Sequence, residues 1–169
     1  MEYARDLLEA LGRLRCSPWS GFVYRHMFAD YPPDRENTLG ARWNPPEVPA
    51  IYTSLDRATV IAEAEYQISL EPLRPRARRT VYQVEVALSA TLDLSAPGAP
   101  SGLGISSHDI AGMDHTVCQV IGGAAEHLDH DGLFVPSARA SGINLVIYPN
   151  RQTASYRFEV RSAEVIYEP

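Results

Sequence analysis

The chain has 169 residues, 45% of them hydrophobic, and this composition suits one compact domain, residues 1–169, with a single core. The 21 acidic and 15 basic residues leave a net charge of −6, which argues against a surface that binds nucleic acid directly. No signal peptide or membrane span is visible, and the two cysteines form no CxxC pair, so we expect a cytoplasmic protein.

The first half of the sequence predicts two helices and two strands around a long loop. Leucines recur at helical spacing over residues 2–14, and Asp56 is a suitable N-cap for a helix that runs to about Leu70. Strands are expected at 21–26 and 50–54. The residues between them, 30–49, are rich in proline, which favours an irregular loop, and long loops in small domains are often functional.

The second half predicts strands and one further helix. An arginine-rich segment, 73–79, which holds Arg74 and Arg76, is interpreted as a solvated stretch or a partner contact. After it we expect strands at 81–88 and 91–94, a Gly/Pro/Ser linker at 95–107, a helix at 114–129, and strands at 132–135, 143–148, 156–160 and 164–167. This order is not the regular alternation of a parallel doubly wound sheet, so we predict a mixed α+β domain.

Arginines and tyrosines stand out in the first half. Arg25 and Arg42 would each be costly in a core without a partner, because a guanidinium cannot lose its charge. They either grip phosphate oxygens as bidentate forks or pair with some of the acidic residues. Tyr24 and Tyr52 lie in predicted strands and either stack on a flat ligand ring or fill the core.

Two carboxylates and one hydroxyl are candidates for acid–base or hydrogen-bonding roles. Glu63 and Glu65 lie in the same predicted helix but point in different directions, and periodicity does not choose between them. Ser137 ends a predicted strand without the Gly-x-Ser-x-Gly context of a nucleophile, so a hydrogen-bonding role is favoured. His127 and His130 lack a third ligand at suitable spacing, and no metal site is predicted.

Several short motifs occur in an order and spacing that together resemble the RES domain family. They are Tyr24-Arg25, Gly-Ala-Arg-Trp-Asn at 40–44, Ile-Tyr-Thr-Ser at 51–54, Glu63, Val-Pro-Ser-Ala at 135–138 and Asn144. The resemblance covers about residues 20–150. The chain departs from the family pattern at Ala41, where a second glycine is commoner, and in the segment Leu-Val-Ile-Tyr-Pro-Asn after Asn144.

The resemblance implies a fold like that of ADP-ribosyltransferases and an active site that consumes NAD as substrate, with no further cofactor. Many members are toxins paired with a helix-turn-helix antitoxin of the Xre type. Carried over residue by residue, Arg25, Glu63 and Ser137 match the family's catalytic positions. The substrate-binding positions are matched by Tyr24, Arg42, Tyr52 and Asn144.

These matches lead to an expected mechanism for cleavage of the bond between nicotinamide and ribose. Arg25 and Arg42 would hold the pyrophosphate, and Tyr24 or Tyr52 would stack on the nicotinamide. Glu63 would stabilise the oxocarbenium-like state, while Ser137 orients the ribose or the amide.

The acceptor stays open between water, phosphate and a protein side chain. We expect a toxin that depletes NAD, with a protein-directed ADP-ribosyltransferase and a non-catalytic nucleotide-binding module as alternatives. The sequence does not decide whether the chain forms a homo-oligomer.

Overall fold

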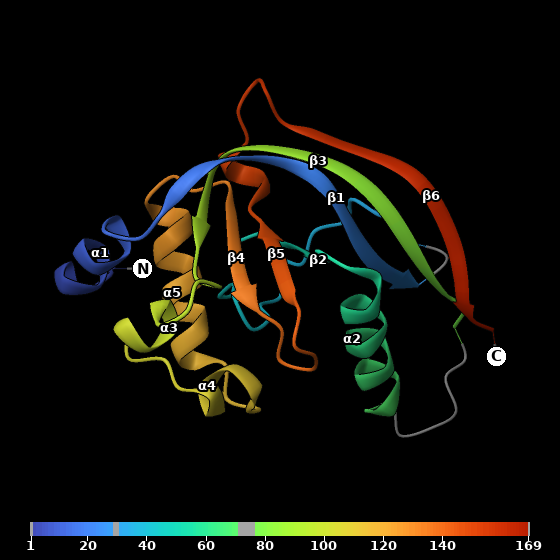
Figure 1. Ribbon diagram of the computed structural model, residues 1–169, viewed down its shortest axis with the longest axis horizontal. Helices are drawn as coiled ribbons and strands as arrows, with labels where there is room; N and C mark the ends of the chain where they lie inside the picture. The colour runs from blue at the N-terminus through green and yellow to red at the C-terminus, as the bar shows by residue number, and fades with distance from the viewer. Residues whose placement is uncertain (1, 29–30, 71–76, 169) are drawn as a thin grey trace.

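The computed structural model describes residues 2–28, 31–70 and 77–168, which form one mixed sheet with helices packed beside it (Figure 1). The strands are β1 (Cys16–Phe28), β2 (Ile51–Ser54), β3 (Arg79–Asp93), β4 (Gly132–Pro136), β5 (Ile143–Ile147) and β6 (Arg157–Tyr167). The helices are α1 (Arg5–Gly12), α2 (Arg57–Ser69), α3 (Ala99–Gly102), α4 (Ser107–Ala111), α5 (Thr116–His127) and the short 3-10 helix η1 (Pro149–Arg151). The predicted combination of helices with a mixed sheet is confirmed.

The sheet closes on itself. Its strand order is β1-β2-β5-β4-β3-β6, and β1 also pairs along its length with β3. The ring β1-β2-β5-β4-β3 is therefore barrel-like, and β6 is added to the outer side of β3. Among the strands of the described residues, only the β3–β4 pair is parallel. In Figure 1, β1 and β3 form a long arch above the shorter strands, and α2 lies beneath the far end of that arch.

Two apolar clusters hold the ring and its helices together. Alternating side chains of β1, β3 and β5 fill the first cluster, which contains Val23, Val84, Val86, Leu145 and Ile147. The second lies between the sheet and the helices α1 and α5, and it contains Leu11, Ile121, Ala124, Leu133 and Tyr148. The sheet is thus covered by α5 on one side, while the region near α2 stays open for a cavity.

The strands predicted at 81–88 and 91–94 are one continuous strand, β3. Pairing with β1 is irregular where Ser89 and Ala90 lie, because the register shifts between Ser17 and Trp19. The Asp131 carboxylate accepts hydrogen bonds from the backbone N–H of Ser89 (2.6 Å) and of Ala90 (2.9 Å). These contacts satisfy donors that the irregularity leaves without a strand partner, so β3 continues through it.

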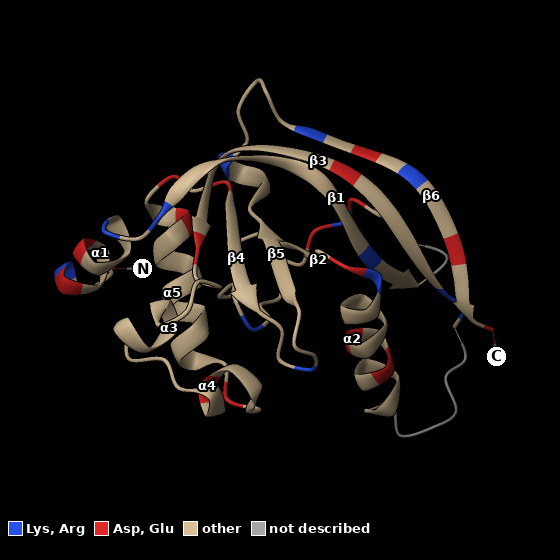
Figure 2. Ribbon diagram, in the orientation of Figure 1, with Lys and Arg blue, Asp and Glu red and all other residues tan. Residues whose placement is uncertain are grey.

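The strands predicted at 156–160 and 164–167 are likewise one strand, β6. A register shift opposite Gln83 and Val84 accommodates the extra residue, and Arg161 reaches across to the Glu85 carboxylate at 2.5 Å. Positive and negative side chains alternate along β6 (Figure 2), which protects an exposed edge strand against pairing with other chains.

The predicted helices are present with shorter limits. Asp56 caps α2 as expected, accepting from the Thr59 N–H at 2.8 Å. The linker predicted at 95–107 contains α3 and leads into α4, whose start is fixed by a capping box between Ser106 and Asp109. Of the predicted loop and basic run, Asp30, Arg74 and Arg76 lie outside the described residues. None of the helices in the described ranges has the length and hydropathy that a membrane crossing requires.

Gly122 lets α5 pack directly against the loop that carries Trp43. A Cβ at position 122 would overlap the Trp43 carbonyl oxygen, which also accepts a hydrogen bond from the Tyr148 hydroxyl at 3.0 Å. The close approach fixes Trp43, whose neighbour Arg42 reaches the cavity. A mid-helix glycine that weakens the helix is therefore retained for packing.

Gly122→Ala is expected to lower the free energy of unfolding by about 1–3 kcal/mol, because overpacking against rigid backbone outweighs the gain in helix propensity. Gly12→Ala is the matched control, since a Cβ there meets nothing within 4 Å. It should leave stability unchanged or raise it slightly. Urea unfolding of both variants measures the difference, and equal stabilities would show that α5 can move away from Trp43 without cost.

Candidate functional site

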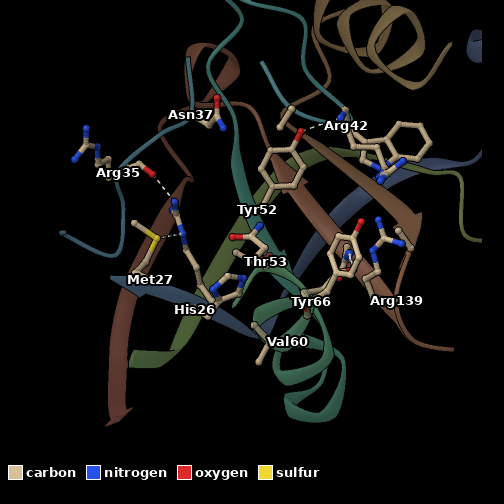
Figure 3. Close-up of a pocket in the computed structure, with 18 of the residues that line it drawn as sticks. His26, Met27, Arg35, Asn37, Arg42, Tyr52, Thr53, Val60, Tyr66 and Arg139 are labelled. Atoms are coloured by element: carbon tan, nitrogen blue, oxygen red, sulfur yellow. Dashed lines mark hydrogen bonds between the residues drawn. The ribbon is translucent and has the colours of Figure 1, made fainter. Parts of the chain in front are cut away.

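A cavity of about 800 Å³ opens between the proline-rich loop, the end of β1, α2 and the turn after β4 (Figure 3). Its volume lies within the range of small-molecule and cofactor sites. Of the residues singled out from the sequence, the cavity is lined by Arg25, Arg42, Tyr52, Glu63 and Asn144. Residues from the first, middle and last thirds of the chain thus meet in one place.

A hydrogen-bonded chain fixes the carboxylate of Glu63. The Ser137 Oγ donates to Glu63 Oε1 at 2.5 Å, and the Asn144 Nδ2 donates to the same oxygen at 2.9 Å. Asn144 is itself oriented by the hydroxyl of Ser54, which donates to Asn144 Oδ1 at 2.7 Å. The other carboxylate oxygen, Glu63 Oε2, accepts no hydrogen bond from the described residues.

Ser137 is held as a donor to Glu63. Its Oγ accepts backbone N–H bonds from Arg139 at 3.1 Å and Ala140 at 3.2 Å, so its hydroxyl hydrogen is directed to the carboxylate. No histidine or lysine contacts Ser137 within the described ranges. The geometry fits a residue that positions Glu63 better than it fits a nucleophile.

Glu65 lies elsewhere. It lines a shallow groove between α2 and β6, together with Ile61 and Val165, on a different side of the helix from Glu63. Two residues along a helix turn the side chain by about 200°, which separates the two carboxylates. Of the two glutamates, the structure brings only Glu63 together with Ser137 and Asn144.

Arg25 organises the wall of the cavity. Its guanidinium donates to the carbonyl oxygens of Pro33 (2.7 Å) and Arg35, and its Nε lies 3.1 Å from Met27 Sδ. Burial lowers the pKa of Arg25 to about 10, partly opposed by the negative charge of Asp34. Arg25 therefore ties the loop at 31–39 to β1, with most of its donors already used by protein atoms.

At one end of the cavity, called here a pole, the aromatic rings of Phe28 and Tyr31 lie against the guanidinium groups of Arg79 and Arg35. The rings of Phe28 and Tyr31 meet edge to face at 5.9 Å. Arg79 lies over Phe28 at 3.9 Å, and Arg35 over Tyr31 at 4.0 Å. Burial and the nearby charges of Arg79 and Arg25 lower the pKa of His26 to about 4, so that its ring is neutral at pH 7.

The opposite pole holds Arg42 and Arg139 (Figure 3). Arg42 Nη1 donates to the carbonyl oxygens of Asp109 (3.3 Å) and Gly112 (2.9 Å), at the end of α4. Arg139 Nη1 donates to the Ala111 carbonyl at 3.1 Å, and its guanidinium lies 3.4 Å from the centre of the Tyr66 ring. Arg25 and Arg42 thus lie in different parts of the cavity, and the structure does not bring them to a single point.

The two tyrosines singled out from the sequence have different environments. The Tyr52 hydroxyl donates to Asn44 Oδ1 at 2.7 Å and accepts from the Trp43 N–H at 2.8 Å, while its ring lines the cavity. Burial raises the pKa of Tyr52. Tyr24 does not line the cavity: its hydroxyl accepts from Gln83 Nε2 at 3.1 Å. Strand alternation turns it away from the face that carries Arg25.

Sequence reasoning missed several residues of the site, namely Ser54, Tyr66, His115 and Arg139. Tyr66 follows Glu63 by three positions, so the helical period alone predicts that both face the same side of α2. Arg139 follows Ser137 by two residues in a turn, where no periodicity gives the direction of a side chain. His115 and Ser54 carry no local signal that marks them.

Comparisons with known proteins identify the family and the fold of this chain. The family model described as the RES domain matches residues 16–168. Proteins named NAD(+) phosphorylase MbcT, from Mycobacterium bovis and Mycobacterium tuberculosis, are each 32% identical to this chain over 142 residues, which cover 79% of this chain and 76% of each relative. A chain in the crystal structure of the M. tuberculosis MbcT-MbcA toxin-antitoxin complex superposes with a TM-score of 0.84 at 27% identity, covering 96% of this chain and 93% of that one.

The family match spans nearly the whole sequence, and the similarity to the curated relatives extends over more than two thirds of it. The motifs at 24–25, 40–44, 51–54 and 135–138 all fall within the matched region. The chain therefore belongs to the RES domain family.

Proposed function

We propose that this protein cleaves the bond between nicotinamide and ribose in NAD⁺ and acts as a toxin that depletes the dinucleotide. The observation that carries the proposal is the Glu63 carboxylate, held by Ser137 and Asn144 inside a cavity whose two poles are cationic. The family membership and the name of the mycobacterial relatives support the same activity. The related fold of ADP-ribosyltransferases remains a prediction from the family resemblance.

The proposed chemistry places positive charge on the ribose carbon as the neutral nicotinamide leaves. A fixed carboxylate with one oxygen free of protein donors can stabilise that charge and accept a bond from a ribose hydroxyl. Ser137 and Asn144 hold the carboxylate so that it need not reorganise during the reaction. Ser54 acts one step further away, since it fixes which end of the Asn144 amide faces Glu63.

The remaining groups suit an elongated anionic substrate. The pole with Phe28, Tyr31, Arg35 and Arg79 offers flat rings and positive charge for the adenosine diphosphate portion. Arg25 supports this pole by holding the loop that carries Arg35. The ring of Tyr52 lines the cavity and is available to contact the nicotinamide ribose.

Two other activities are alternatives for the same cavity. A protein-directed ADP-ribosyltransferase would label a target in lysate supplied with labelled NAD⁺, and a binding module would retain NAD⁺ without consuming it. The complete hydrogen-bonded network around Glu63 favours turnover over simple binding, because binding alone does not require a fixed carboxylate.

Glu63→Gln is expected to lower kcat by about 10²–10³-fold, because the amide cannot stabilise the developing charge. Glu65→Gln is the matched control on the same helix and should retain wild-type activity, since residue 65 faces the groove beside β6. The measurement is release of nicotinamide from NAD⁺ by the purified proteins, with products identified by chromatography. Loss of turnover in Glu65→Gln with full activity in Glu63→Gln would overturn the assignment.

Ser137→Ala is expected to reduce kcat by about 10–100-fold, the effect of losing a hydrogen bond to a charged group. A nucleophilic serine would lose on the order of 10⁶-fold and would form a covalent adduct with substrate. Steady-state kinetics and mass spectrometry of the enzyme during turnover separate the two roles. An ADP-ribosyl adduct on Ser137 would contradict the positioning role.

We also infer that the protein is neutralised by an antitoxin, since the mycobacterial chain it superposes on lies in a toxin-antitoxin complex. Expression of the chain alone should lower cellular NAD and arrest growth, and expression with a protein encoded beside it should restore both. The Glu63→Gln variant is the control: if toxicity depends on the cavity, expression of this variant should not arrest growth. Arrest of growth without a fall in NAD would contradict NAD depletion as the toxic activity.

A further inference from the structure

His26 is a polar side chain of the cavity that takes no part in holding Glu63. It lies near the end of β1 and lines the cavity, and Figure 3 shows it at the same end as Met27 and Arg35. The positive charge of Arg79, whose guanidinium lies over an aromatic ring of this pole, also acts on His26. His26 therefore belongs to the pole that holds the aromatic rings.

Neither ring nitrogen of His26 makes a hydrogen bond to the residues that the structure describes. Nδ1 is fully enclosed by protein, whereas Nε2 is not enclosed. Because the ring lines the cavity, Nε2 is the nitrogen that a ligand can reach. Buried polar groups in proteins are nearly always paired, and an apolar ring of the same shape would pack here at no such cost. The missing partner of His26 is therefore expected to come from a bound ligand.

The ring of His26 is neutral at pH 7, because burial and the charges of Arg79 and Arg25 lower its pKa to about 4. A neutral imidazole carries one N–H and one lone pair. Enclosed N–H groups without an acceptor are rarer than enclosed acceptors without a donor, so we assign the lone pair to Nδ1 and the hydrogen to Nε2. His26 thus offers the cavity a single uncharged N–H donor.

The surroundings of His26 suit a nucleobase better than a phosphate group. The rings of Phe28 and Tyr31 and the thioether of Met27 line the same part of the cavity, and they offer flat or adaptable apolar contacts. The ring nitrogens of adenine are uncharged acceptors, which match an uncharged donor. Phosphate oxygens are matched better by the guanidinium of Arg35. This pole therefore fits the adenine of a dinucleotide.

We propose that His26 is a specificity-determining residue that donates a hydrogen bond from Nε2 to a ring nitrogen of adenine, and that the protein thereby selects NAD⁺ over nicotinamide mononucleotide. This inference rests on the proposed function and deepens it. Both compounds contain the bond between nicotinamide and ribose, so Glu63 meets the same ribose in each and does not distinguish them. The distinction must come from the part of the cavity that only the dinucleotide reaches.

The first test measures the stability of His26→Phe, which keeps a ring of similar size and removes both nitrogens. The midpoint of urea unfolding should stay unchanged or rise, because an unpaired polar group is replaced by an apolar one. His108→Phe is the matched control, since His108 is exposed and does not line the cavity. A lower midpoint in His26→Phe alone would show that the ring nitrogens already have partners in the free protein, which contradicts the proposal.

The second test compares the two substrates through release of nicotinamide. In His26→Phe the KM for NAD⁺ should rise about 3–10-fold with kcat nearly unchanged, as expected for losing one hydrogen bond. Turnover of nicotinamide mononucleotide, which lacks adenine, should be no worse in the variant than in the wild type. Equal losses with both substrates, or a wild-type protein that cleaves both equally well, would overturn the role of His26 and leave the proposed function intact. If NAD⁺ is not consumed at all, the proposed function itself is wrong.

The third test probes the adenine pole without relying on turnover of the shorter substrate. Adenosine monophosphate should inhibit the wild type competitively against NAD⁺, and its inhibition constant should rise about 3–10-fold in His26→Phe. Uridine monophosphate carries the same ribose and phosphate with a different base, so it should inhibit more weakly and equally in both proteins. An inhibition constant for adenosine monophosphate that the substitution leaves unchanged would show that His26 does not contact adenine.

Discussion

The position of one carboxylate depends on three neighbouring strands. Glu63 Oε1 receives its two hydrogen bonds from Ser137, just after β4, and from Asn144 in β5, while Ser54 in β2 orients Asn144. Because β2, β5 and β4 are adjacent in the sheet, the strand order itself fixes the distances between these polar groups. The helix α2, which carries Glu63, needs only to lie beside β4 and β5 for these hydrogen bonds to form.

Closure of the sheet extends this arrangement to the arginine of the family motif. Tyr24 pairs with Ser54, so β1 brings Arg25 to the same end of the sheet as the Glu63 network. The Arg25 guanidinium donates hydrogen bonds to carbonyl groups of the loop at 31–39, and these bonds offset the cost of burying its charge. Arg25 therefore shapes the cavity wall, because it holds the part of the loop that carries Arg35.

Local signals predicted the elements but not the contacts between them. The Asp56 cap, the alternation in the strands and the proline-rich loop can each be read from a few residues. The continuity of β3 depends on Asp131, which is more than forty positions away from Ser89 and compensates for an irregular register. The choice between Glu63 and Glu65 depends on distant strands in the same way, and for that reason helical periodicity left it open. Arg139 escaped prediction because its direction is set by the Tyr66 ring and a carbonyl of α4.

The distribution of charge explains how an acidic protein can hold a small anion. The chain carries a net charge of −6, yet arginines outnumber glutamates among the residues that line the cavity. Exposed carboxylates such as Glu65 and Asp114 lie outside the cavity, where they oppose the approach of long polyanions such as nucleic acids. Inside the cavity, walls of low polarity strengthen the attraction between the guanidinium groups and any anion small enough to enter. The outer charge and the inner charge therefore favour small anions over long polyanions.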